Sequence, residues 1–221
     1  MTRRPPKLLI TAGPSREYFD DVRFLSNGSS GAQGIALAEA ARDAGLAVEL
    51  LLGPTALAPP DGVTVNRFEG AEELDRLARE AWPDTDAFVA TAAVCDYRPA
   101  ERIDGKRKKE PGDWTVRLVR NPDVLASRGA EKGDRTVIGF ALESTPIEEA
   151  RGEAHRKLES KGLDVIILNG PANMGRDAGT FEWIEAARPP APPAVTSLGD
   201  VTKRDLARRI VEYLVERHPI G

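Results

Sequence analysis

The chain has 221 residues, of which 41% are hydrophobic and 30% charged, enough to bury the core of one α/β domain without disulfides. A net charge of −4 argues against a nucleic-acid partner, and the lack of a long apolar run argues against a signal peptide or a membrane span. A single cysteine excludes an internal disulfide and, with only two histidines, makes a His/Cys zinc site unexpected, so we expect a cytoplasmic protein.

Apolar segments alternate with helical patterns along the first part of the chain. The patterns predict strands at residues 7–13, 47–53, 63–68 and 86–94, and helices at 32–44 and 71–82. The segment 86–94 carries almost no polar residue, as is typical of a strand that helices cover on both faces.

The second part of the chain continues this alternation and then changes to the pattern of a β-hairpin followed by a helix. Strands are expected at 114–120, 136–142 and 163–169, with a charged helix at 146–162 that ends at a C′ glycine, Gly162. GTFEWIEA and AVTSLG flank the proline-rich turn RPPAPP and predict a hairpin, and a final helix follows at 202–218, where Thr202 and Asp205 approximate a capping box. We therefore expect a single domain over 1–221, a Rossmann-like open and mostly parallel sheet with helices on both faces, plus a C-terminal β-hairpin and helix.

Polar residues follow several of these strands, where open parallel sheets bind their ligands. The loop FLSNGSSGAQG, residues 24–34, combines three glycines and three serines before a helix. It favours a polar or anionic ligand about as well as a long turn with a serine N-cap. A dinucleotide fingerprint is not present, because Gly28, Gly31 and Gly34 have the wrong spacing.

The basic run KRKK, residues 106–109, has three interpretations. A solvated loop is the plainest and nuclear localisation the weakest. In an acidic protein, the run also suits a mobile basic flap over phosphates, and we expect residues 98–113 to form it.

Asp96 could bind ligand hydroxyls, amines or a divalent metal ion. The plain alternatives are a solvent-exposed loop residue or a helix N-cap. The run Asn121-Pro122-Asp123 predicts a helix start with Pro122 at the first helical position. Cys95 is expected to be a small, partly buried residue, and a nucleophilic role has no support in the sequence.

Six motifs occur together in one order: ITAGPSRE, DDVRFLSNGSSGAQG, ATAAVCDYRPA, GKRKK, NPDVLA and IGFALES, between residues 10 and 144. In this the chain resembles phosphopantothenoylcysteine synthetase. The resemblance implies a ligase of coenzyme A biosynthesis that joins 4′-phosphopantothenate to L-cysteine through an acyl-nucleotide made from CTP (or ATP) with Mg²⁺, releasing pyrophosphate and the nucleoside monophosphate. It also implies a homodimer and, since the flavin decarboxylase half of the bacterial fusions has no counterpart here, a stand-alone synthetase without flavin.

The resemblance implies roles for individual residues. Asn27 holds the acyl-nucleotide, and Lys106 serves its turnover. The implied nucleotide-binding residues are Ala90, Thr91, Ala92, Asp96, Lys106, Asn121, Pro122, Asp123, Val124, Phe140, Lys157 and Lys161. The implied substrate-binding residues are Asn27, Gly28, Ser29, Ser30, Gly31 and Ala93. For Lys157 and Lys161 a solvated helix face is the plain alternative, and no metal ligand can be named.

Several positions depart from the family pattern. A larger residue is usual at Gly28 and a lysine at Ala32, and two motifs differ at 141–144 and 169–170. These changes bear on substrate affinity and nucleotide choice rather than on the reaction class.

Two other hypotheses remain open on the sequence. A nicotinamide-dependent reductase fits the sheet, but not the glycine spacing, and the second strand ends at Gly53 rather than at an acidic residue. A non-catalytic binding partner of a separate decarboxylase is also possible, although the retained Asn27 and Lys106 argue against it.

Overall fold

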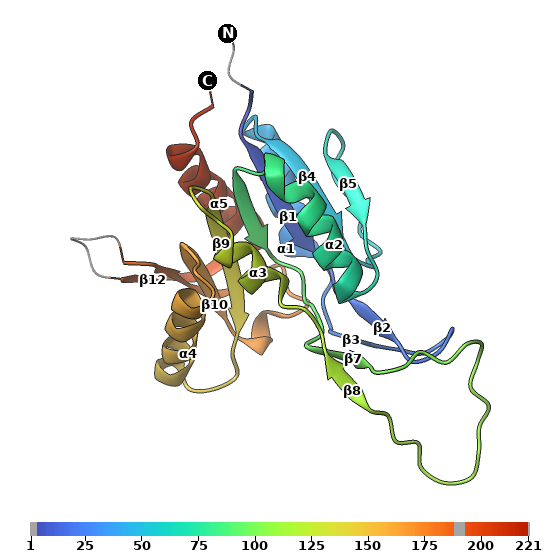
Figure 1. The fold of residues 1–221 in the computed structure, drawn as a ribbon. Helices are drawn as coiled ribbons and strands as arrows, with labels where there is room; N and C mark the ends of the chain where they lie inside the picture. The colour runs from blue at the N-terminus through green and yellow to red at the C-terminus, as the bar shows by residue number, and fades with distance from the viewer. Residues whose placement is uncertain (1–3, 188–192, 221) are drawn as a thin grey trace.

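An eight-stranded sheet forms the centre of the computed structural model, which describes residues 4–187 and 193–220 (Figure 1). The strand order is β12 (Ala194–Thr202), β11 (Ala178–Glu185), β10 (Val165–Asn169), β9 (Thr136–Leu142), β6 (Ala87–Ala90), β1 (Lys7–Ala12), β4 (Ala47–Leu52) and β5 (Thr64–Arg67). From β10 to β5 all neighbours pair in parallel, whereas β11 and β12 are antiparallel. The predicted fold class is confirmed, including the C-terminal hairpin.

Helices cover both faces of this sheet (Figure 1). The helices are α1 (Ala32–Asp43), α2 (Ala71–Ala81), α3 (Val124–Ala130), α4 (Ile147–Ser160) and α5 (Lys203–Arg217). On one face Leu37 of α1 and Ile210 of α5 belong to one buried cluster. On the other face Leu74 of α2 and Leu158 of α4 belong to a second. Because both faces are buried, the parallel strands are nearly all apolar, as their sequence indicates.

The helix ends follow the predicted capping with one exception. The hydroxyl of Thr202 accepts the N–H of Asp205 at 3.1 Å, and Gly162 has a φ of 65° directly after Lys161, the C-cap of α4, so both predictions are confirmed. Pro122 is not the first helical residue, because Asp123 is the N-cap of α3 and its carboxylate accepts the N–H of Ala126 at 2.9 Å.

Two predicted strands are shorter than expected. The strand predicted at 86–94 ends at Ala90, and the following residues turn to line a cavity described below. The strand predicted at 114–120 is reduced to β8 (Leu118–Arg120), which pairs outside the central sheet. The proline-rich turn lies outside the described residues at 188–192.

An arm extends from the carboxyl edge of the sheet (Figure 1). It consists of two small antiparallel pairs, β2 (Arg16–Tyr18) with β3 (Phe24–Ser26) and β7 (Tyr97–Pro99) with β8, and of the long loop at 100–117. Strands of three residues leave little periodicity in a sequence, which is why the arm was not expected. Over residues 4–187 and 193–220, no helix combines the length and apolar character needed to cross a membrane.

Candidate functional site

Two cavities adjoin at the carboxyl ends of the parallel strands. The first pocket has a volume of about 510 Å³ and the second about 550 Å³. Ala92, Val94, Asp96 and Phe140 line both, so the two pockets meet along a common wall. Together they form one site with two compartments at the place where open parallel sheets bind ligands.

The residues predicted to bind nucleotide gather mainly in the first pocket. Those that line it are Ala90, Ala92, Asp96, Asn121, Pro122, Asp123, Val124, Phe140 and Lys161. All the residues predicted to bind the second substrate line the second pocket, namely Asn27, Gly28, Ser29, Ser30, Gly31 and Ala93. The fold thus separates the two predicted sets into two adjoining compartments.

Three predicted residues fall elsewhere. Thr91 lines the second pocket, and its hydroxyl donates to the carbonyl of Thr11 at 2.6 Å. Lys157 lines neither pocket, and its ammonium pairs with Glu143 at 2.6 Å. Lys106 is exposed on the arm and lines neither pocket. The nucleotide roles of these three residues stay predictions, as do the binding roles of the residues that line the two pockets.

Asn27 lines the second pocket and is held there by the segment that follows β6. Its side-chain Nδ2 donates to the carbonyls of Ala93 at 3.2 Å and Val94 at 3.0 Å. The contact with Val94 brings the amide close to the common wall, since Val94 lines both pockets. Asn27 is therefore placed next to the junction of the two compartments.

The serine–glycine loop begins α1 without a side-chain cap. The N-cap is Gly31, whose φ of 76° favours glycine, so a serine N-cap is not what the loop provides. The hydroxyls of Ser29 and Ser30 instead accept the N–H groups of Gly31 and Ala32 at 3.3 and 3.4 Å. Gly34 lets α1 approach the sheet closely, because a Cβ there would overlap the side chains of Ala12, in β1, and Thr91, directly after β6.

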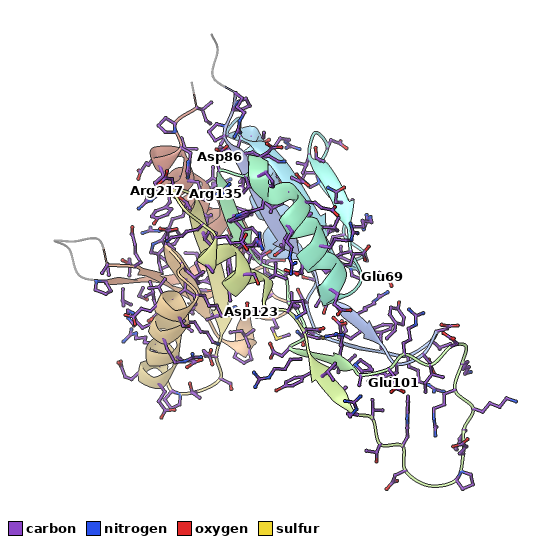
Figure 2. The ribbon with its side chains drawn as sticks, viewed as in Figure 1. Glu69, Asp86, Glu101, Asp123, Arg135 and Arg217 are labelled. Atoms are coloured by element: carbon purple, nitrogen blue, oxygen red, sulfur yellow. The ribbon has the colours of Figure 1, made fainter. Side chains whose placement is uncertain are left out.

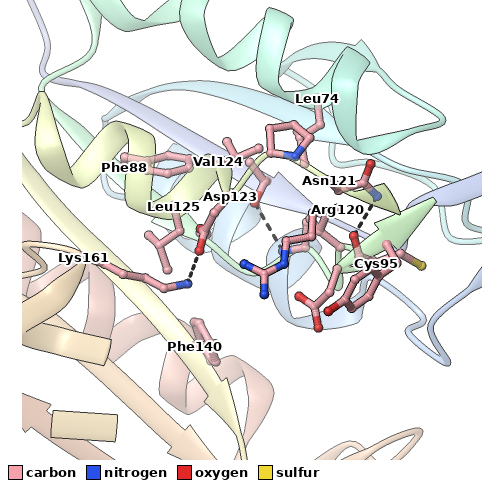
Figure 3. A pocket seen from close by; sticks show the side chains of 17 residues that line it. Leu74, Phe88, Cys95, Arg120, Asn121, Asp123, Val124, Leu125, Phe140 and Lys161 are labelled. Atoms are coloured by element: carbon pink, nitrogen blue, oxygen red, sulfur yellow. Dashed lines mark hydrogen bonds and ion pairs between the residues drawn. The ribbon is translucent and has the colours of Figure 1, made fainter. Parts of the chain in front are cut away.

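The Asn121–Asp123 turn shapes the first pocket (Figure 3). The side chain of Asn121 donates to the carbonyl of Cys95 at 2.8 Å, and its backbone N–H donates to that of Asp96 at 2.8 Å. Besides capping α3, the carboxylate of Asp123 pairs with Lys161 at 2.7 Å. Figure 2 places Asp123 near the sheet and Glu101 out on the arm. The turn therefore joins α3, α4 and the segment after β6 around one cavity.

Two cations of the site, Arg120 and Lys203, were not expected from the sequence. Arg120 lines the first pocket and extends its guanidinium into it (Figure 3). Its position directly before the Asn121–Asp123 turn could have indicated that it belongs to the site. Lys203 lines the second pocket, far in sequence from the serine–glycine loop, and no local pattern connects the two.

Cys95 is buried beside the first pocket. Burial raises the pKa of its thiol, and the nearby carboxylates of Glu17 and Asp96 raise it further, against a hydrogen bond to Ser15 that lowers it. A thiol with a raised pKa is a poor nucleophile at neutral pH. This agrees with the structural role expected for the residue.

Lys106 is bracketed by hydrogen bonds from its two neighbours to the β2–β3 turn. The N–H of Arg107 donates to the carboxylate of Asp20 at 3.1 Å, and the N–H of Gly105 donates to Asp21 at 3.0 Å. The lysine is thus carried on a segment with defined contacts. That residues 98–113 act as a mobile flap stays a prediction.

Within the part of the chain that the structure describes, no group of three or more His, Cys, Asp or Glu side chains could hold a metal ion. The carboxylates that line the first pocket are those of Asp96 and Asp123. Any metal ion in this site would need further ligands from a bound substrate.

A parallel sheet with two adjoining cavities at its carboxyl edge defines an α/β protein with a candidate site of two compartments. Residues 4–217 match the family model of the DNA/pantothenate metabolism flavoprotein C-terminal domain, and the chain belongs to that family.

Named relatives agree with this assignment. The chain is 39% identical over 190 residues to the coenzyme A biosynthesis bifunctional protein CoaBC of Vibrio vulnificus strain CMCP6, with 82% of this chain and 47% of the relative covered. It is 41% identical over 223 residues to CoaBC of Mycobacterium bovis, covering 95% of the chain and 52% of the relative. The chain thus spans about half the length of the curated relatives it matches.

A solved structure supports the same fold. The crystal structure of the C-terminal domain of CoaBC superposes with a TM-score of 0.78 at 34% identity, covering 95% of this chain and 93% of that one. A nicotinamide-reductase assignment has no counterpart among these relatives.

Proposed function

We propose that the chain is a phosphopantothenate–cysteine ligase of coenzyme A biosynthesis. It joins 4′-phosphopantothenate to L-cysteine with CTP, or ATP, as co-substrate. The observation that carries the proposal is the separation of the two predicted residue sets into two pockets that share Asp96 and Phe140. The relatives named CoaBC, of which the chain matches about half the length, and the C-terminal domain of CoaBC, which has the same fold, support it.

In the first step the carboxylate of 4′-phosphopantothenate attacks the α-phosphorus of the nucleotide, and the bond to pyrophosphate breaks. Both reactants are anions, so the site must hold them together against their repulsion. Arg120 and Lys161, in the first pocket, supply positive charge for the phosphates. The acyl-nucleotide then lies at the junction of the two pockets. Asn27 would donate to it from Nδ2 in exchange for one of its hydrogen bonds to the carbonyls of Ala93 and Val94.

In the second step the amine of cysteine attacks the acyl carbon. The nucleoside monophosphate leaves with the electron pair of the broken C–O bond, and the amine loses a proton as the amide forms. The chemistry needs no covalent bond to the protein and transfers no electrons, so it requires no flavin. We assign Lys106 to the turnover of the intermediate. This role requires the part of the arm that carries Lys106 to approach the two pockets.

Mg²⁺ fits this site as an ion that arrives with the nucleotide. It is commonly held by one or two carboxylates together with substrate phosphates. Asp96 is the carboxylate best suited to it, because it lines both pockets while Asp123 is already paired with Lys161. The ion would offset the charge of the phosphates.

We further propose that the protein is a homodimer that pairs through its arms. The arm exposes large apolar side chains, with Val22 54%, Phe24 40% and Tyr97 44% accessible. Such a concentration on a projecting element suits a protein interface. Sedimentation analysis should give a dimer for the wild type and a monomer for Phe24→Glu; a monomeric wild type at micromolar concentration would refute this part of the proposal.

The test of the function is pyrophosphate release by the purified chain with 4′-phosphopantothenate, L-cysteine and Mg²⁺, run in parallel with CTP and ATP. Release that depends on phosphopantothenate supports the ligase, and the preferred nucleotide identifies the co-substrate. If neither nucleotide gives release, the chain is better explained as a binding partner of a separate decarboxylase. A pull-down with that decarboxylase would then be expected to show a stable complex.

A further inference from the structure

A third pocket, with a volume of about 650 Å³, adjoins the first. The two share Arg120, Asn121 and Pro122, so the Asn121–Asp123 turn forms part of the wall between them. Arg98, in β7, lines the third pocket and does not line the first. Its guanidinium therefore reaches the turn from outside the first pocket.

Arg98 contacts both the turn and α2. Its Nη1 donates to the carbonyl of Arg120 at 2.7 Å and to the side-chain Oδ1 of Asn121 at 3.3 Å. Its Nη2 pairs with the carboxylate of Glu72, in the first turn of α2, at 2.7 Å. A guanidinium presents its donors as a rigid planar fork, so one side chain fixes the turn relative to α2.

These contacts also fix which end of the Asn121 amide faces each neighbour. Oδ1 accepts from Arg98, while Nδ2 donates to the carbonyl of Cys95 at 2.8 Å. In a reversed amide the NH₂ would face the guanidinium and the oxygen would face the carbonyl, and both hydrogen bonds would be lost. Nδ2 carries two N–H groups and Cys95 takes one, so the other is available to a ligand of the first pocket.

The arm itself does not depend on the Arg98 side chain. The backbones of β7 and β8 pair from Tyr97 with Arg120 to Pro99 with Leu118. The side chain of Glu72 is 65% exposed, so its ion pair with Arg98 adds little stability. Loss of the guanidinium should therefore leave the arm folded and act on the turn.

We propose that Arg98 is a positioning residue for the first pocket: it holds the carbonyl of Arg120 and the amide of Asn121 in the orientation that receives the nucleotide. The inference rests on the proposed function, because that function assigns the nucleotide to this pocket. Arg98 does not line the pocket, so it acts through Asn121 rather than on a ligand.

The test uses Arg98→Met, which keeps an unbranched apolar stem and removes every donor. Its matched control is Arg76→Met, because Arg76 lines the same third pocket but pairs with Glu80 at 2.8 Å. Arg98→Lys is the conservative variant, which keeps the charge without the planar fork. For each protein, calorimetry measures the Kd for CTP and for ATP without phosphopantothenate, and kinetics give kcat and the KM for each substrate.

Arg98→Met is expected to raise the Kd and KM for the nucleotide roughly tenfold, equivalent to about 1.4 kcal/mol. The KM for phosphopantothenate should stay close to wild type, because residues 120–123 do not line the second pocket. Arg98→Lys should fall between the two, and Arg76→Met should bind nucleotide as the wild type does. An unchanged nucleotide Kd in Arg98→Met, or equal rises in KM for both substrates, would overturn the positioning role.

A double-mutant cycle with Asn121→Ala separates action through the turn from a general effect on the fold. If Arg98 acts through Asn121, Arg98→Met should weaken nucleotide binding far less when residue 121 is already alanine than it does in the wild type. Losses that simply add in the double variant would overturn the proposal.

The two proposals fail in different ways. Absence of turnover in the wild type would count against the ligase. A nucleotide Kd weakened by Arg98→Met and not by Arg76→Met would still support the positioning role in the same protein, and equal Kd values in all three would overturn it.

Discussion

The backbone N–H of Arg107 donates to the carboxylate of Asp20 at 3.1 Å, and this contact joins the basic segment to the opposite hairpin of the arm. Asp20 is fully buried, and its carboxylate also accepts the N–H groups of Val22 and Arg23 at 2.9 and 2.8 Å. One carboxylate therefore organises the β2–β3 turn and the residue that follows Lys106. We infer that Asp20 positions Lys106 without touching a substrate.

Replacement of Asp20 by asparagine should release the basic segment. Asparagine loses the charge that strengthens these hydrogen bonds, so we expect trypsin to cleave at 106–109 roughly tenfold faster. Glu110→Gln is the matched control, since it removes only the exposed ion pair with Arg107. Equal cleavage rates in Asp20→Asn and the wild type would show that other contacts hold the segment.

The ionisation of the Asp20 carboxyl should make the stability of the protein depend on pH. Burial opposes its ionisation, but the N–H donors of Val22, Arg23 and Arg107, together with the Arg23 guanidinium, outweigh burial and hold the pKa of Asp20 below its ordinary value of 3.8. A lowered folded pKa stabilises the protein above the ordinary value and loses that effect as pH falls through the folded pKa. The difference in unfolding free energy between wild type and Asp20→Asn should therefore be full at pH 7 and shrink below about pH 4. Urea unfolding at pH 7, 4 and 3 measures it, and a difference that is constant with pH would contradict the assignment.

Lys106→Gln tests the role of the basic run in the proposed reaction. Loss of a cation needed for turnover of the intermediate should slow product formation by more than roughly tenfold, or about 1.4 kcal/mol of transition-state stabilisation. Lys109→Gln, also exposed in the same run, is the control for Lys106→Gln. Wild-type rates for Lys106→Gln would return KRKK to the solvated-loop interpretation.

Asn27→Asp is a separate test of the residue assigned to hold the intermediate. This variant should retain nucleotide binding but yield no product.

Much of this fold could be predicted because its strands are buried on both faces and therefore read as apolar runs. The start of the final helix and the end of α4 were equally predictable, since Thr202 and Gly162 mark these helix ends by local chemistry. The arm was not visible. Its strands are three residues long, and β7 and β8 are defined by pairing between segments that are far apart in the sequence, such as Tyr97 with Arg120.

The site could be predicted to the extent that its residues follow strands. Asn27, Asp96 and Asp123 all do so, and the fold brings each to a pocket. Lys203 could not be found this way, because it reaches the second pocket only through the packing of α5 on α1. Lys157 and Lys161 looked equivalent in the sequence, yet the C-terminal position of Lys161 directs it to Asp123 and the first pocket, while Lys157 pairs with Glu143.

Because Lys161 lines the first pocket and Lys157 does not, we expect unequal effects when each is replaced by methionine. Lys161→Met removes a cation that lines the first pocket, so the nucleotide KM should rise roughly tenfold, as expected for loss of a charge-assisted contact. Lys157→Met removes the same charge from the same helix but outside the pocket, and its KM should stay close to wild type. Equal rises would mean that Lys157 leaves Glu143 when nucleotide binds, and would restore the role implied by the family resemblance.

Two glycines in helices give opposite predictions for stability. A Cβ at Gly34 would overlap the side chains of Ala12 and Thr91, so Gly34→Ala must push α1 off the sheet and should cost about 1–3 kcal/mol. A Cβ at Gly152, on the exposed side of α4, meets no atom within 4 Å, so Gly152→Ala should stabilise the protein by roughly 0.5–1 kcal/mol through helix propensity. Thermal and urea unfolding of both variants measure the signs. If Gly34→Ala were as stable as the wild type, α1 would not depend on this close approach, and the geometry of the serine–glycine loop at its start would need another cause.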